Sequence, residues 1–371
     1  MPRVFVAAVA AVTISAPVWA HHGFGRFDPS RDIEVEGTLT GVDFVNPHAY
    51  VYFDAVGSDG EIIPMRCEMR AATVLRRSGW SAEMFVDGAR VAVSGNPHRD
   101  DPASCYVETM AIGDAPPVER YAQLDEGSTE RPDRPLRLPS GEPNITGDWA
   151  QEQYLIARSP NGRGGLVPES MVAAVEAGEI EASAAPNSGW GARPVTLTEA
   201  GQAAADELRN LPPQANPRMS CQITSILFDW VFDGPINRIT QGEDEITMEY
   251  GRGLTRTIHM NMESHPSDIA PSRAGHSIGR WEGDTLVVDT VGFSPGILAG
   301  QVVHSDELHI VERFTLDPET MALERDYVAE DALYFADQYV GSDTVLPADA
   351  PFAVDPCEEL TYRNYAEEAQ E

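Results

Sequence analysis

Short runs of β-forming residues, bounded by glycine, proline or aspartate, recur along most of this chain and constrain its fold more than any other feature. In the first third such runs cover residues 33–43, 49–56, 61–68, 90–94 and 105–112, with a helical pattern at 71–77. Five strands with one helix after the third is the order of a small OB-like barrel. We expect that barrel over residues 21–113.

A second series of runs follows in the C-terminal part of the chain. The expected strands are 222–232, 237–241, 245–251, 255–260, 285–290, 308–316 and 323–328, after a helical insert at 169–177 and 197–211. The second insert helix has a capping box formed by Thr196 and Glu199. Evenly spaced short strands are typical of an antiparallel barrel or sandwich. Lipocalin-like barrels carry a Gly-x-Trp on their first strand, and Gly147 and Trp149 form such a tripeptide in this chain.

The predicted fold class is therefore all-β with minor α. A small OB-like barrel is followed by a larger antiparallel lipocalin-like β-barrel over residues 144–355. Residues 114–143 contain six prolines without apolar periodicity and are predicted to be a linker. Residues 356–371 form an acidic tail.

Residues 1–20 have the pattern of a cleavable signal peptide. Arg3 precedes an apolar core, and Val18 and Ala20 occupy the positions that signal peptidase recognises, so we expect cleavage after Ala20. The apolar run is shorter than the roughly 18 residues of a transmembrane helix. We predict a periplasmic or secreted protein with no membrane span.

Four cysteines in an exported chain suggest two disulfides. Cys67 and Cys105 precede the predicted linker, and Cys221 and Cys357 follow it. We therefore predict the pairs Cys67–Cys105 and Cys221–Cys357.

The charge balance excludes several classes of function. The chain has 26 basic and 59 acidic residues, a net charge of −33, and every basic residue is arginine apart from the histidines. Nucleic acids and anionic membranes are poor partners for such a surface. Without lysine, Schiff-base chemistry and the lysine of a phosphate-binding loop are also excluded.

Cleavage after Ala20 would make His21 and His22 the first residues of the mature protein. His21 then offers a ring nitrogen and a free α-amino group, and His48 or His98, each after an Asn-Pro turn, could complete a copper site. Copper is the one cofactor that this pattern suggests. In the alternative interpretation the two histidines are a frayed end, and His48 stabilises a turn.

The densest chemical signal lies between His265 and Arg313. Candidate catalytic residues are His276, Arg280, His304 and His309, and candidate ligand-binding residues are His265, Ser277, Trp281 and Asp284. Histidine transfers protons near neutral pH, so an isomerase or lyase reaction on a small ligand is one interpretation, with an arginine holding an anionic oxygen. Metal binding by three histidines is another. A Ser-His hydrolase is weaker because no nucleophile elbow is present, and in a purely structural interpretation the histidines bind loop carbonyls.

Glu312 lies on the apolar face of its predicted strand. A carboxylate there must be paired, protonated or functional. Arg256 shares a face with apolar residues in the same way and is the expected partner. A ligand-binding role for Glu312 is kept as the alternative.

Two resemblances to known families agree with these divisions. HHGFGRFD, VEGTLTGVDFVNPHAYVYFD and DGARVAVSGNPHRD resemble a family of exported bacterial domains of unknown function that begin with a His-His pair, which implies the small barrel. GHSIGRWEGDTLVVDTVGF and HSDELHIVERF resemble a large uncharacterised exported bacterial family with a lipocalin-like barrel, over roughly residues 144–335. In that second pattern a proline usually stands where this chain has Val303.

Three functions remain open from the sequence. The first is an exported protein that binds a small molecule in the larger barrel, as a lyase or isomerase that uses histidine acid-base chemistry. The second is a periplasmic copper-binding protein that uses the mature N-terminal histidine. The third is a non-catalytic envelope scaffold.

Overall fold

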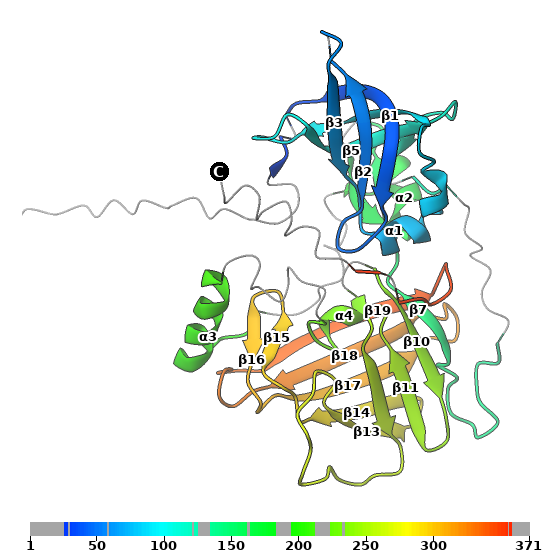
Figure 1. The fold of residues 1–371 in the computed structure, drawn as a ribbon. Coiled ribbons are helices and arrows are strands. Elements are labelled where there is room, and N and C mark those ends of the chain that lie inside the picture. Colours follow the sequence, from blue (N-terminus) through cyan, green and yellow to red (C-terminus); the bar gives the residue numbers. More distant parts are fainter. Residues whose placement is uncertain are drawn as a thin grey trace, which may run out of the picture.

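Two β-barrels dominate the computed structural model (Figure 1). It describes residues 26–357 except 29, 58, 121, 125–133, 162–163, 183–193, 212–222, 232–233 and 355. The predicted signal peptide, His21, His22 and nearly all of the acidic tail lie outside the described residues. The predicted fold class, mostly β with a small and then a larger barrel, is confirmed. In the part of the chain that is described, no helix has the length and apolar character needed to cross a membrane.

The small barrel has five strands in the predicted order. They are β1 (Ile33–Asp43), β2 (Tyr50–Val56), β3 (Ile62–Glu68), β4 (Arg90–Pro97) and β5 (Ser104–Ile112). β1 pairs with β2 and β4, β4 pairs with β5, and a parallel pairing of β3 with β5 closes the barrel. Helix α1 (Ala72–Arg77) and the short 3-10 helix η2 (Ala82–Met84) connect β3 to β4, and β6 (Val118–Glu119) adds to β5 within the segment predicted as a linker.

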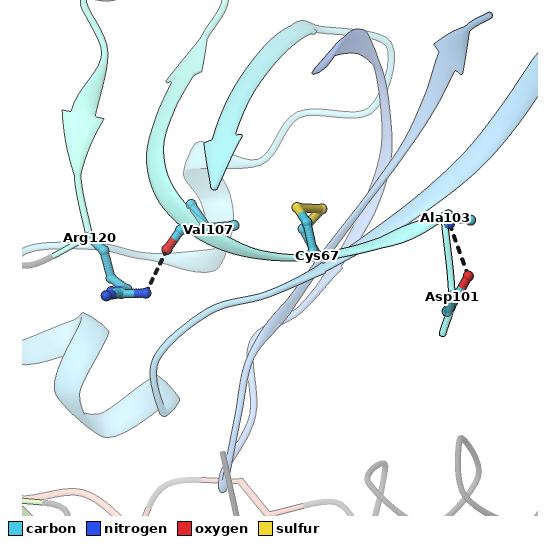
Figure 2. The surroundings of a disulfide bond; sticks show 6 residues. Cys67, Asp101, Ala103, Val107 and Arg120 are labelled. Atoms are coloured by element: carbon cyan, nitrogen blue, oxygen red, sulfur yellow. Dashed lines mark hydrogen bonds between the residues drawn. A yellow bond between two sulfur atoms is a disulfide. The ribbon is translucent and has the colours of Figure 1, made fainter. Parts of the chain in front are cut away.

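A disulfide crosses the closing pair of strands in the small barrel. Cys67 and Cys105 lie directly opposite each other in the β3–β5 register, and both are fully buried (Figure 2). This confirms the first predicted pair. Cys357 is disulfide-bonded, but Cys221 lies outside the described residues, so the second pair stays a prediction.

The large barrel is closed by nine strands. They are β7 (Gly147–Ala150), β10 (Ile236–Gln241), β11 (Glu245–Glu249), β12 (Thr255–His259), β13 (His276–Glu282), β14 (Thr285–Val291), β17 (His309–Leu316), β18 (Leu323–Glu330) and β19 (Tyr339–Pro347). Neighbouring strands are antiparallel except β12 and β13, which are parallel. The parallel pair requires a long crossover, and the segment 260–275 provides it. Trp149 of the Gly-x-Trp lies on β7 and is fully buried.

Short elements decorate the large barrel. They are the hairpins β8 (Tyr154–Arg158) with β9 (Gly164–Pro168) and β15 (Gly296–Ala299) with β16 (Val302–His304), and the helices α2 (Glu169–Glu176) and α3 (Glu199–Asn210). The expected cap at Thr196 is wrong. Thr198 caps α3 by accepting the amide N–H of Gly201, while the Thr196 hydroxyl donates to Asp337.

The expected strand at 222–232 is also wrong, because its described part turns into helix α4 (Phe228–Val231). The Asp229 carboxylate accepts the amide N–H groups of Thr224 and Ser225, which bends the chain before the helix. Nearly every described residue of the segment is buried, and a run buried on all faces has no periodicity that separates strand from helix. Trp230 from this helix packs in the barrel core with Tyr250 and Phe314.

The two barrels are joined by a buried arginine. Arg77, at the end of α1, forms an ion pair with Asp349 (2.8 Å) and donates to the carbonyls of Gln151 and Gly234. Gln153 donates to both Asp349 and the Arg77 carbonyl. Since hydrogen bonds to charged groups are stronger than neutral ones, this junction ties the small barrel to the segments that flank β7, β10 and β19.

Candidate functional site on the outer wall of the large barrel

Strand β13 carries most of the sequence motif and presents it on two opposite faces. Successive side chains of a strand alternate between faces. Ser277 is fully buried and contacts Arg256 inside the barrel, and Trp281 packs against the core. His276 and Arg280 therefore point outward, so the predicted site residues are divided between an inner network and an outer cluster.

The inner network is a chain of buried charges. Glu312 forms ion pairs with Arg256 (2.5 Å) and with Arg325 (3.1 Å), and Arg325 also forms one with Asp343. Arg256 donates to the hydroxyls of Ser277 and Thr290. The expected pairing of Glu312 with Arg256 is confirmed.

The charged groups of the inner network are buried and interact with one another. Burial disfavours the Arg256 cation, but Glu312 and Tyr250 together outweigh this effect, and the pKa of Arg256 is raised. Burial raises the pKa of Asp343, against the opposing attraction of Arg325. Glu312 and Ser277 are both completely buried. The network therefore presents neither side chain to solvent.

The outer cluster contains three of the predicted histidines, two of which contact one carboxylate while the third contacts one of those two. Asp289 on β14 lies with Oδ1 at 3.1 Å from Nε2 of His265 and at 3.0 Å from Nε2 of His309. Nδ1 of His265 lies 2.9 Å from Nδ1 of His276. His265 comes from the β12–β13 crossover, and the other members come from β13, β14 and β17.

The carboxylate fixes the tautomers along this chain. An ionised carboxylate only accepts hydrogen bonds, so Nε2 of His265 and Nε2 of His309 each carry a proton. In neutral His265 the other nitrogen, Nδ1, is then an acceptor, and Nδ1–H of His276 donates to it. This assignment leaves Nε2 of His276 unprotonated.

His276 is well suited to act as a base. Burial lowers its pKa, and the neighbouring His265 and His259 lower it further. Its Nε2 has no hydrogen-bond partner among the residues that the structure describes, and the side chain remains partly exposed. A neutral imidazole with an open lone pair can accept a proton from a bound molecule.

Two further pairs extend the cluster along the wall. The ring of His259 stacks on His276 with centroids 5.0 Å apart, and its Nδ1 lies 3.3 Å from Glu245. At the other end, Nδ1 of His309 lies 3.9 Å from Glu330. The cluster thus runs across the strands from β11 to β18.

The remaining predicted site residues lie elsewhere. His304 is buried, its Nδ1 lies 2.9 Å from the Ser305 carbonyl, and burial lowers its pKa. No described contact joins His304 to the outer cluster. Asp284 forms an exposed ion pair with Arg137.

The two candidate metal-binding histidines of the small barrel, His48 and His98, differ in the contacts that their ring nitrogens already make. Nδ1 of His48 lies 3.1 Å from the Glu68 carboxylate. Nδ1 of His98 already accepts two backbone N–H groups, from Asp100 and Asp101. Within the described ranges, no three or more His, Cys, Asp or Glu side chains are placed to hold a metal ion.

Sequence reasoning missed Asp289 and His259. Asp289 stands in the run TLVVDTV, where a lone carboxylate in an apolar strand is a signal of the same kind as Glu312. His259 ends β12, and only the parallel pairing with β13 brings it beside His276. Neither neighbour relation follows from spacing along the chain.

Comparison with known proteins gives a match for the small barrel. Residues 8–106 match the model of a family of unknown function (DUF6152). This agrees with the resemblance found for the N-terminal domain. No curated protein matches the sequence. No solved structure matches it either.

Proposed function

We propose that this is an exported protein that binds a small molecule on the outer wall of the large barrel and exchanges a proton with it at His276. The observation that carries the proposal is the chain Asp289–His265–His276, which orients the imidazole and leaves Nε2 as the acceptor. The reaction class is proton transfer, as in an isomerase or lyase.

The proposed step needs no cofactor. Nε2 of His276 removes a proton from a carbon next to a carbonyl group, so that a C–H bond breaks and an N–H bond forms. The electron pair moves onto the carbonyl oxygen as an enolate. The charge on the imidazolium is shared through Nδ1–H with His265, which faces Asp289. Return of the proton to another atom completes an isomerisation.

Deuterium exchange tests this step without knowledge of the natural ligand. The probe is acetone in D₂O, with loss of its methyl proton signal followed by NMR. We expect the full chain to exceed an equimolar concentration of free imidazole by about a hundredfold, the lower end of general-base contributions. The variant His276→Gln should lose this excess, while the control His48→Gln, in the small barrel, should retain it. Exchange no faster than with imidazole would refute the proposal.

A second candidate function, copper binding at the mature N-terminus, is supported by a separate observation. Glu68 lies against Nδ1 of His48, and metal-binding histidines commonly have a carboxylate at the nitrogen that does not bind the metal. Burial raises the pKa of Glu68, while His48 and Arg26, the first described residue, oppose that shift. The N-terminal segment therefore enters the described structure near Glu68.

Intact mass with one equivalent of Cu(II) tests the second candidate. Protein exported through its own signal and cut after Ala20 should retain one copper. One extra residue before His21 should abolish this binding, because the amino group moves. Equal retention by the extended protein would contradict the assignment.

A further inference from the structure

Strands β13 and β17 carry the same order of outward side chains. On β13 these are His276, Ile278 and Arg280, and on β17 they are His309, Val311 and Arg313. Both strands pair antiparallel with β14, so they run in the same direction on either side of it.

The β14 register aligns the two sets level by level. Val291 pairs with His276, Asp289 pairs with both Ile278 and Val311, and Val287 pairs with both Arg280 and Arg313. Since Thr290 pairs with Ile310, His309 lies at the level of Val291. The outer wall thus has a histidine level, a middle level of Ile278, Asp289 and Val311, and an arginine level.

The arginine level has donors that remain available. Arg280 and Arg313 bind opposite oxygens of Glu282. Asp326, an exposed residue of β18, pairs with Arg313 at the same level, so these four charged groups carry no net charge. Arg313 uses only Nη2 there, and its Nε and Nη1 have no partner among the described residues. Side-chain exposure is 60% for Arg280 and 47% for Arg313. These donors of Arg313 can hold a carboxylate through charge-assisted hydrogen bonds.

The middle level provides apolar contact. Ile278 and Val311 are partly exposed on either side of Asp289, whose carboxylate is engaged by His265 and His309. The next strand adds Val328, which pairs with Val311 and is also partly exposed. Four residues along a strand span about 13 Å, which sets the distance between the histidine and arginine levels.

We infer that the ligand of this wall is an elongated amphipathic carboxylate. Its carboxylate binds Arg280 and Arg313, its apolar chain lies over Ile278 and Val311, and its other end reaches His276. The inference rests on the proposed function for the role of His276, and it adds the ligand class and the role of Arg313. Helices α2 and α3 pack instead against β8, β9 and β16, away from these strands (Figure 1).

Binding of decanoate tests the ligand class independently of any proton transfer. Decanoate has the charge and the chain but no ketone, so its binding does not depend on His276 as a base. Backbone amide shifts of β13 and β17 are followed by NMR during titration of the full chain. The comparison ligands are decanol, which has the chain without the charge, and acetate, which has the charge without the chain.

We expect decanoate to bind at least about tenfold more tightly than either comparison ligand, as one charge-assisted contact predicts. The double variant Arg280→Gln with Arg313→Gln should reduce decanoate affinity by a similar factor. The control Arg90→Gln, an exposed arginine paired with Glu36 on the small barrel, should not. Equal binding of decanoate and decanol, or no shifts on β13 and β17, would overturn the ligand class. Acetone exchange at His276 would still report separately on the proposed function.

Discussion

The inner and outer faces of the same strands use charged residues in opposite ways. Inside the barrel, Glu312 is enclosed by Arg256 and Arg325, and all three side chains are at most 1% exposed. Outside, Asp289 and His276 are partly exposed, and one imidazole nitrogen has no described partner. A fully buried network of paired charges has a structural role, whereas a half-exposed cluster with an open lone pair can react. Four predictions test this contrast.

The largest effect is expected for Glu312→Ala. It leaves two buried guanidinium groups without their shared carboxylate, and removal of one partner from a buried ion pair costs about 3–5 kcal/mol. Chemical denaturation measures the change in free energy of unfolding. Glu324→Ala, an exposed carboxylate on β18, is the matched control and should change it by less than about 0.5 kcal/mol. Equal effects of the two substitutions would show that the inner network does not stabilise the barrel.

Adjacent residues on β13 provide a second comparison. Ser277→Ala removes the oxygen that accepts from Nε of buried Arg256 and should cost about 1–3 kcal/mol. His276→Ala, one residue earlier on the outer face, should cost about 0.5 kcal/mol or less. A larger loss for His276→Ala would contradict the assignment of the faces.

The third prediction concerns the loss of stability at acidic pH. Because burial lowers the pKa of His304 below its ordinary 6.5, the unfolded chain binds the proton first as pH falls. The stability that depends on neutral His304 is therefore present above pH 6.5 and is lost below it. One such proton lowers the unfolding free energy by about 1.4 kcal/mol per pH unit. His304→Asn, which keeps a donor for the Ser305 carbonyl, should flatten the pH dependence, and an unchanged slope would refute this account.

The smallest effect on stability is expected for Asp289→Asn. The side chain is partly exposed, so the unfolding free energy should change by about 0.5 kcal/mol or less. The tautomers should change, however, because an amide no longer requires Nε2–H on both His265 and His309. Nitrogen-15 NMR of the imidazoles measures this directly. Unchanged tautomers would show that Asp289 does not set the orientation of His276.

Much of the fold follows from local pattern. The predicted strand 33–43 coincides with β1, and 245–251 and 323–328 differ from β11 and β18 only at one end. The alternation of apolar and polar residues predicted these strands because one face of each is buried. It failed at 222–232, where all faces are buried. It also missed β13, whose glycine and polar residues resemble a loop.

The site was predicted only in part, for a physical reason. Histidine density pointed to His265, His276 and His309, but His304 shares that density and lies apart in a buried hairpin. Asp289 was missed because its partners lie 24 and 20 residues away along the chain and meet it only through strand pairing.

The sequence by itself determined the two β-rich units, the Cys67–Cys105 pair and the residues able to transfer protons, because these depend on local periodicity and residue chemistry. Only the tertiary structure decided which face of β13 is interior. That choice depends on Arg256 and Glu312, which are 56 residues apart and meet when the barrel closes. Closure places Ser277 inside, where it belongs to the buried network, and His276 outside, where the proposed proton transfer takes place.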